Sequence, residues 1–356
     1  MRISHIVSSL GIGGAEAFVT DLGIAQARAG LAVQVIALSD AAELGETSPV
    51  GAQNLARLEA AGVEVATLGH RARRRILPAA WAMRGRLNTF RPDIVHAHLP
   101  TGILLLILSG WRGAMVATHH NTPLPLPAWA MGLLARRARG FVAISQPGVA
   151  VLEGVCRCPV TLIPNGIDLS RIPDAPPPSR AEGGPLTVLS LGNLRAQKNY
   201  PHLVEIAARL PGFRFQIAGE GDERGAIEAA IARHGVADRV TLLGARSDVP
   251  DLLVGADIFL QTSTYEGMPI ALIEAMRAGL PIVASDVGAC GEMLEGSGAL
   301  LAPPNDTDAF VAHLSELAES APRRTEIAEK ARQRARIFDI EITAARYHAL
   351  YETVIP

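Results

Sequence analysis

The feature that most constrains the fold is a regular alternation of short β-rich runs with alanine-rich helical stretches along the 356 residues. Each run is rich in Val, Ile and Leu and ends near Gly, Ser or Asp. Such alternation predicts parallel sheets covered by helices on both faces. The candidate strands of the first half are Ile3–Val7, Val33–Leu38, Val63–Leu68, Ile94–Ala97, Met115–Thr118, Phe141–Ile144 and Val160–Ile163. Those of the second half are Thr187–Leu191, Arg214–Ala218, Val240–Leu243, Ile258–Gln261 and Ile282–Ala284.

A proline- and glycine-rich segment separates the two series of strands. It includes DAPPPSRAEGGP, into which no packed element fits. We therefore expect two doubly wound α/β domains, at 1–168 and 186–337, joined by a linker at 169–185. Ligands bind beyond the carboxyl ends of the strands in such sheets, so two facing domains predict a site in a central cleft. One more helical pattern, 338–354, could cap either domain.

Charge and cysteine content exclude several classes of protein. The net charge of −2 argues against a nucleic-acid partner. Three cysteines, two of them in a C-x-C pair, form neither a zinc framework nor a disulfide set. The first residues enter a strand without signal-peptide features, and the apolar run Gly102–Trp111 is shorter than the ~20 residues that span a bilayer. A cytoplasmic location is the expectation.

A glycine-rich loop in the first half lies where ligands are expected. SLGIGGAE, at 9–16, places Gly13 and Gly14 between a strand and a helix, where backbone N–H groups can approach a phosphate. A plain tight turn explains the glycines as well. Their spacing is not G-x-G-x-x-G, which makes a nicotinamide dehydrogenase the weakest function considered.

Four histidines end two neighbouring strand candidates. His96 and His98 could bind a metal, but no nearby carboxylate or thiolate completes a site, so packing and hydrogen bonding are favoured. His119 and His120 are better placed to contact a substrate, because a proline-rich loop follows them.

The second half carries cations and carboxylates at strand ends. LGNLRAQKN places Arg195 and Lys198 after a strand, where fixed cations suit a diphosphate leaving group, although a solvated basic turn is the alternative. In STYEGMPIALIEAM, Glu266 precedes a helix start and Glu274 lies about two turns into the helix. A helix start favours phosphate. Two flanking carboxylates therefore predict a nucleotide sugar, with Glu266 beside the sugar and Glu274 beside the ribose. A helix-start charge at Glu266 and a surface residue at Glu274 are the alternative, although Glu274 lies in ALIEAM, where a plain buried face disfavours a carboxylate.

The chain resembles retaining glycosyltransferase family 4, with its GT-B fold of two Rossmann-like domains. YEGMPIALIEAMRAGLPIVASDVG is similar to the E-x7-E signature of that family. GIGGAE, DIVHAH, THHN, IPNGID, GNLRAQKN, GEGDER, LLGARSDVP and ADIFLQTSTYEG occur in the family's order, so the resemblance covers nearly the whole chain.

The resemblance implies roles for individual residues. The catalytic set would be Glu266 at the donor sugar, Lys198 at the diphosphate, Arg195, and His120 in the cleft, with His119 as the second choice. The donor-binding residues would be Gly13, Gly14, Asn193, Gly219, Arg246, Gly267, Met268, Pro269, Ile270 and Glu274. The family often has arginine where this chain has Asn193, and Arg195 is expected to compensate.

The resemblance also implies a reaction. The enzyme would transfer a sugar, of hexosyl type and with retention, from a UDP- or GDP-sugar to a glycan or lipid-linked acceptor, in cell-surface polysaccharide or glycolipid synthesis. No metal and no other cofactor is expected, since lysine, arginine and helix dipoles replace it. In this fold the last helix, here 338–356, packs back on the N-terminal domain. A sugar-nucleotide epimerase or hydrolase and a catalytically silent binding subunit are the alternatives.

An asymmetry of charge suggests where the acceptor is presented. Between Val65 and Leu152 the only carboxylate is Asp93, whereas eleven arginines and three tryptophans lie in the same span. LPAWAMGLLARRARG, at 126–140, suits the headgroup layer of an anionic membrane, such as the inner face of the cytoplasmic membrane. Solvated arginines beside a packed apolar face are an equally weighted alternative.

Overall fold

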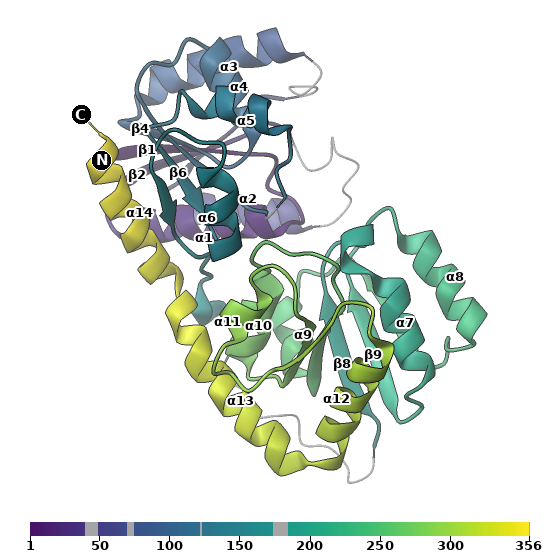
Figure 1. The fold of residues 1–356 in the computed structure, drawn as a ribbon. Coiled ribbons are helices and arrows are strands. Elements are labelled where there is room, and N and C mark those ends of the chain that lie inside the picture. Colours follow the sequence, from purple (N-terminus) through teal and green to yellow (C-terminus); the bar gives the residue numbers. More distant parts are fainter. Residues whose placement is uncertain (40–48, 70–74, 122, 174–183, 356) are drawn as a thin grey trace. The chain divides into compact units, whose positions relative to one another are not determined.

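The computed structural model divides the chain into two compact units, each built on one parallel sheet (Figure 1). Unit 1 comprises Met1–Asp168 and Asp339–Pro356, and unit 2 comprises Leu169–Phe338. The structure describes residues 1–39, 49–69, 75–121, 123–173 and 184–355. Most of the predicted linker, and Arg71, Arg73 and Arg74 of the basic span, lie outside the described residues.

Unit 1 contains a seven-stranded sheet in the order β3-β2-β1-β4-β5-β6-β7. Its strands are β1 (Arg2–Val7), β2 (Ala32–Ala37), β3 (Glu64–Thr67), β4 (Ile94–Ala97), β5 (Ala114–His119), β6 (Gly140–Ala143) and β7 (Val160–Leu162). All neighbours are parallel, and His5 of β1 lies in register with His96 of β4. The direction in which strands are added reverses between β1 and β4.

Helices cover both faces of this sheet (Figure 1). They are α1 (Gly14–Arg28), α2 (Val50–Ala60), α3 (Ile76–Phe90), α4 (Pro100–Leu108), α5 (Ala128–Ala135), α6 (Gln146–Glu153) and α14 (Ile340–Val354). On one face α1 packs against α2 and α14, and on the other α4 packs against α3 and α5. Sequence explains the helix starts: Pro100 takes the first turn of α4, and Ser145 Oγ caps α6 by accepting from Gly148 N.

Helix α14 is an integral part of unit 1. Tyr347 and Tyr351 are fully buried. The Tyr351 hydroxyl lies 2.7 Å from His96 Nδ1, and the Tyr347 hydroxyl lies 3.1 Å from Thr118 Oγ1. These bonds join the last helix of the chain to β4 and β5.

Unit 2 contains a six-stranded parallel sheet in the order β10-β9-β8-β11-β12-β13. Its strands are β8 (Leu186–Leu191), β9 (Phe213–Ala218), β10 (Val240–Gly244), β11 (Ile258–Gln261), β12 (Ile282–Ser285) and β13 (Leu300–Ala302). Its α-helices are α7 (Tyr200–Ala208), α8 (Arg224–His234), α9 (Val249–Val254), α10 (Ile270–Ala278), α11 (Cys290–Leu294), α12 (Thr307–Glu319) and α13 (Ala321–Ala335). Helix α7 packs against α8 and α12 on one face, whereas α10 packs against α9 and α13 on the other (Figure 1).

The edge strand β13 was not among the predicted strands. It has three residues and follows Gly296 and Gly298, both with positive φ, so its pattern resembles a loop. Across the described ranges, no helix has both the length and the apolar character needed to cross a bilayer.

Candidate active site

The carboxyl ends of β8 and β11 bring together two of the residues predicted for donor chemistry, Lys198 and Glu266. The strand order of unit 2 reverses between these two strands, since β9 and β10 lie on one side of β8 and β11 lies on the other. Ligands of doubly wound sheets bind outside this point of reversal. Lys198 ends the 3-10 turn η3 (Ala196–Lys198) after β8, and Glu266 lies in the loop after β11.

Lys198 and Glu266 are in direct contact. Lys198 Nζ lies 2.5 Å from Glu266 Oε1, and the side chains are only 16% and 5% exposed. A charge-assisted bond with so little solvent around it is strong and directional. Among the described residues Glu266 is the one hydrogen-bond partner of this ammonium group, which has three N–H donors.

Two further side chains fix the Glu266 carboxylate. Ser263 Oγ donates to Oε1 at 2.7 Å, and Gln197 Nε2 donates to Oε2 at 3.2 Å. Gln197 Nε2 also donates to the backbone carbonyl of Tyr265, and the backbone carbonyl of Gln197 accepts from Thr264 N at 2.8 Å. The loops after β8 and β11 are therefore tied together around Glu266. The sequence did not single out Ser263 or Gln197, although Gln197 adjoins Lys198 and Ser263 lies three positions before Glu266.

Glycines allow the surrounding loops to approach closely. A Cβ on Gly288, at φ 57°, would lie 1.9 Å from the Glu266 carbonyl oxygen. A Cβ on Gly219 would lie 1.9 Å from the Gly192 carbonyl oxygen. The loop after β9 thus meets the loop after β8 backbone to backbone, and the loop after β12 meets the loop after β11 in the same way, so glycine at these two positions is a steric requirement. Gly219 was a predicted donor-site residue, whereas Gly288 was not.

Helix α10 begins at this edge of the sheet, directly after Gly267 and Met268. Pro269 is its N-cap residue and makes no side-chain capping bond, and Ile270 is its first residue. The first N–H groups of a helix point outward and carry partial positive charge. Glu274 lies further along α10 and is half-buried, between buried residues on either side.

The remaining predicted residues of unit 2 differ in their surroundings. Asn193 is half-buried and its carbonyl accepts from Arg195 N at 2.8 Å, whereas Arg195 itself is exposed. Arg246 follows β10 and forms a two-bond ion pair with Asp248, with Nε 2.7 Å from Oδ1 and Nη2 bonded to Oδ2. This pairing raises the pKa of Arg246 and lowers the pKa of Asp248. The thiol of Cys290, near Glu266, has its pKa raised to about 12 by burial and by that carboxylate.

In unit 1 the glycine loop and the histidines lie at the carboxyl ends of neighbouring strands. Gly13 is the N-cap of α1 with an extended backbone, and Gly14 is exposed at the first position of that helix. His120 follows β5 and is half-buried; its Nε2 lies 3.0 Å from His98 Nδ1. His119, the second choice, is the buried last residue of β5.

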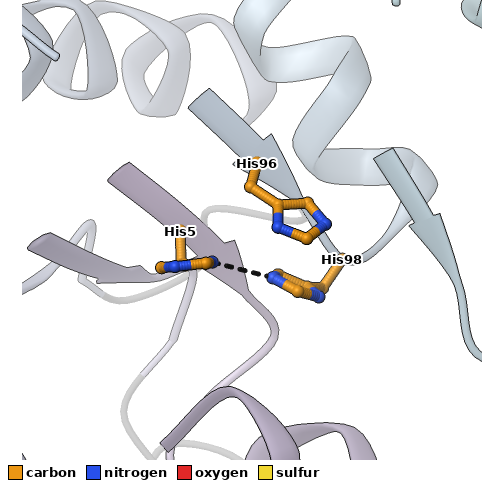
Figure 2. A group of neighbouring side chains, drawn as sticks. All are labelled: His5, His96 and His98. Atoms are coloured by element: carbon orange, nitrogen blue, oxygen red, sulfur yellow. Dashed lines mark hydrogen bonds between the residues drawn. The ribbon is translucent and has the colours of Figure 1, made fainter. Parts of the chain in front are cut away.

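His98 and His120 belong to a buried histidine cluster that also contains His5 and His96. The ligand atoms of His5, His96 and His98 lie within 4.8 Å of one another, which is close enough for a metal. Figure 2 shows His5 directed at His98, with the His96 ring above the His98 ring; the latter two centroids are 4.0 Å apart.

All six ring nitrogens of these three histidines already have hydrogen-bond partners. Rings whose nitrogens are bonded to other groups do not direct three lone pairs at one point. The arrangement therefore fits hydrogen bonding and not metal binding.

The fold and this edge of the sheet define a class of protein. Two parallel sheets that each reverse their strand order beside their first strand are the two Rossmann-like domains of a GT-B glycosyltransferase. The structure of Anabaena Alr3699/HepE in complex with UDP and glucose has this fold, with a TM-score of 0.83 over 99% of this chain and 100% of that one, at 20% identity.

The sequence comparisons identify the family. The family described as Glycosyltransferase Family 4 matches residues 12–171, and Glycosyl transferases group 1 matches residues 172–334. The chain belongs to the GT-B glycosyltransferases of the family 4 type, which confirms the resemblance found in the sequence.

Curated relatives share part of their length with this chain. Glycogen synthase of Mycobacterium tuberculosis (strain CDC 1551 / Oshkosh) is 27% identical over 274 residues, which are 70% of this chain and 66% of that enzyme. Phosphatidyl-myo-inositol mannosyltransferase of Mycolicibacterium smegmatis is 29% identical over 282 residues, or 74% of this chain and 71% of that enzyme. The chain thus spans about two thirds of the length of these relatives.

Proposed function

We propose that this protein transfers a sugar, with retention of anomeric configuration, from a UDP- or GDP-sugar to a glycan or lipid-linked acceptor. The observation that carries the proposal is the Lys198–Glu266 contact at the point of strand reversal in unit 2. A cation and a carboxylate held together there match the two ends of a sugar diphosphate.

Lys198 is suited to the departing diphosphate. One of its donors is directed to Glu266, which orients the ammonium group, and the other two can reach phosphate oxygens. The N–H groups at the start of α10 add positive charge. Because negative charge on the diphosphate grows as the bond to the sugar breaks, these groups stabilise the transition state more than the ground state. No metal is needed for that step in this proposal.

Glu266 is suited to the sugar. The residue is 4% exposed, and Lys198, Ser263 and Gln197 fix its carboxylate, so the orientation of that carboxylate is defined. In the proposed reaction the C1–O bond to the diphosphate breaks and the acceptor oxygen attacks C1 from the same face. The acceptor proton passes to the departing phosphate oxygen. Glu266 binds sugar hydroxyls and is not a covalent nucleophile.

The comparisons support the donor class. Solved neighbours include Anabaena Alr3699/HepE with UDP-glucose, at 19% identity. A screen of UDP-, GDP- and ADP-sugars by thermal shift, followed by incubation with acceptors, tests the proposal. NMR of the product gives the anomeric configuration, and an inverted product would contradict retention. Donor breakdown without any acceptor product would favour a hydrolase or epimerase.

We also propose that the acceptor is presented at an anionic membrane, in cell-surface polysaccharide or glycolipid synthesis. The exposed surface of unit 1 supports this. Trp81 on α3 is 80% exposed and Trp129 on α5 is 75% exposed, with Leu77 at 72% and Leu133 at 57% on the same helices. Both helices pack against α4. Exposed tryptophan and leucine beside arginines suit a headgroup layer.

The structure indicates which residues to replace in a membrane-binding experiment. Arg137 Nη2 donates to the Trp111 carbonyl and Arg139 Nη1 donates to the Val354 carbonyl, so replacing them would disturb the fold as well as the surface charge. The better variant is Trp81→Ser/Trp129→Ser. Its control is Ile337→Ser, which replaces an apolar residue of unit 2 that is 46% exposed. We expect salt-sensitive co-sedimentation with phosphatidylglycerol vesicles that only the tryptophan variant loses. No binding by the wild type at low salt would favour an acceptor away from membranes.

A further inference from the structure

A continuous chain of hydrogen bonds runs through the interior of unit 1 and ends at His120. Gln26 Oε1 lies 2.7 Å from His5 Nε2, and His5 Nδ1 lies 3.0 Å from His98 Nε2. His98 Nδ1 lies 3.0 Å from His120 Nε2. Figure 2 shows the central link between His5 and His98. The chain links α1, β1 and the residues that directly follow β4 and β5.

The pairings determine where each ring carries its hydrogen. The Gln26 amide oxygen can only accept, so His5 Nε2 must donate to it, which leaves Nδ1 of a neutral His5 as an acceptor. His98 must then donate from Nε2 and accept at Nδ1. Because His98 Nδ1 accepts, His120 must donate to it from Nε2, and Nδ1 of a neutral His120 then carries a lone pair that can accept a hydrogen bond. In the structure Gln26 presents its amide oxygen to His5, while its Nε2 has no hydrogen-bond partner among the described residues, and this orientation of one amide sets the direction of three imidazoles.

The surroundings keep these rings uncharged. Burial lowers the pKa of His5 to about 4, with a smaller opposing effect of Gln26, and burial and the adjacent His119 lower the pKa of His120 to about 3. Burial and the other imidazoles lower the pKa of His96 and His98. The other groups facing the chain are the Tyr347, Tyr351 and Thr118 hydroxyls, which bond to one another or to His96. No carboxylate contributes to these shifts.

The end of the chain is an acceptor that needs a partner. His120 Nδ1 is buried and has no hydrogen-bond partner among the described residues. A buried acceptor without a partner is destabilising and calls for an explanation, and a bound ligand can supply one.

We propose that Gln26, His5 and His98 are positioning residues that hold His120 in the Nε2–H tautomer, so that its Nδ1 accepts a hydrogen bond from a ligand hydroxyl. The identity of that ligand rests on the proposed function, which makes it a sugar. Because His120 Nδ1 then carries a lone pair, the site binds a ligand group that donates a hydrogen bond and not one that only accepts. Replacing the facing hydroxyl by fluorine, which can only accept, should weaken binding as much as replacing it by hydrogen, ~tenfold or more.

Histidine-selective ¹⁵N NMR tests the tautomers without any turnover. Long-range ¹H–¹⁵N correlations distinguish the two tautomers, and a His120→Asn variant identifies the resonance of His120. We expect His120 to be a neutral Nε2–H ring from pH 7 down to pH 5. An Nδ1–H ring or an imidazolium at pH 7 would overturn the proposal even if the protein is an active glycosyltransferase.

A variant of Gln26 tests the cause of the tautomer. Gln26→Met removes the acceptor, so both directions of the chain become possible and an Nδ1–H population should appear on His120. Gln34→Met is the control, because Gln34 is also buried in unit 1 but bonds Ser4 and Glu64. An unchanged His120 spectrum in a folded Gln26→Met variant would show that Gln26 does not set the direction.

A variant of His98 tests whether this residue passes on the direction set by Gln26. His98→Asn keeps an amide near the Nδ1 position that can either accept from or donate to His120, but it removes the link toward His5. If Gln26 acts through His98, an Nδ1–H population should appear on His120 in this variant, as in Gln26→Met. A single Nε2–H tautomer in a folded His98→Asn variant would show that His98 does not pass on that direction.

Discussion

Replacing Lys198 by methionine is the most direct test of how unit 2 handles the donor. Methionine preserves much of the side-chain length and removes the charge. In the structure this abolishes the 2.5 Å contact with Glu266 and leaves that carboxylate bonded to Ser263 and Gln197. The substitution therefore separates the charge of Lys198 from its packing.

The expected magnitudes differ for stability and turnover. Breaking a buried ion pair typically costs ~3–5 kcal/mol of folding free energy, and the bonds that Ser263 and Gln197 still donate to Glu266 place this case at about 3 kcal/mol. Removing a fixed group that stabilises developing charge typically lowers kcat by ~10²–10³. We therefore expect a folded protein with a large loss of turnover.

The assay measures release of nucleoside diphosphate, with affinity for free UDP and GDP determined by calorimetry. Gln197→Met is the matched control, since it removes an uncharged donor to the same carboxylate, and we expect a loss of only ~1 kcal/mol in stability. The decisive comparison is made in a Glu266→Gln background. If Lys198 acts on the diphosphate itself, Lys198→Met should lower turnover and diphosphate affinity there as well. Values within twofold of the Glu266→Gln protein would show that Lys198 only anchors Glu266 and would refute the reasoning.

Four further outcomes are expected. Glu274→Ala should weaken nucleotide binding ~tenfold, whereas Glu266→Ala should chiefly reduce sugar transfer; equal wild-type turnover in both would contradict the assignment. Arg195→Ala should lower turnover if this exposed arginine substitutes for the arginine usual at Asn193, and an unchanged rate would show that no substitute is needed. Gly288→Ala should destabilise unit 2, measured by urea unfolding, because its Cβ would meet the Glu266 carbonyl at 1.9 Å. The histidines of the buried cluster have pKa values below 6.5 in the folded state, so the unfolded chain binds more protons than the folded chain below pH 6.5. The free energy of unfolding should therefore fall from pH 6.5 toward pH 4. Equal stability at pH 7 and pH 5 would contradict these pKa shifts.

The sequence predicted the two parallel sheets well, because buried parallel strands are continuous apolar runs. Each predicted strand has a counterpart whose ends differ by at most one residue, as for β5 at Ala114–His119. The edge strand β13 was missed, since three residues after a glycine-rich turn carry too little periodicity to indicate a strand.

The candidate site was predicted residue by residue but not as an arrangement. Lys198 and Glu266 were identified from their places after strands, and their contact depends on β8 and β11 being neighbours, which periodicity does not reveal. Ser263 and Gln197 are ordinary polar loop residues in sequence. His5 lies inside an apolar strand, where nothing local distinguishes a hydrogen-bond relay from a buried polar residue.

The return of α14 to unit 1 has a consequence for the order in which the chain folds. Unit 2 is one continuous segment, Leu169–Phe338, and its core can form as soon as that segment leaves the ribosome. Unit 1 cannot complete its core until Tyr347 and Tyr351 have been synthesised and have bonded to β4 and β5. During synthesis the first unit to emerge is thus the last to finish. A chain truncated after Phe338 and released from the ribosome would expose the α14-binding surface of unit 1 to chaperones, while its complete unit 2 would resist proteolysis.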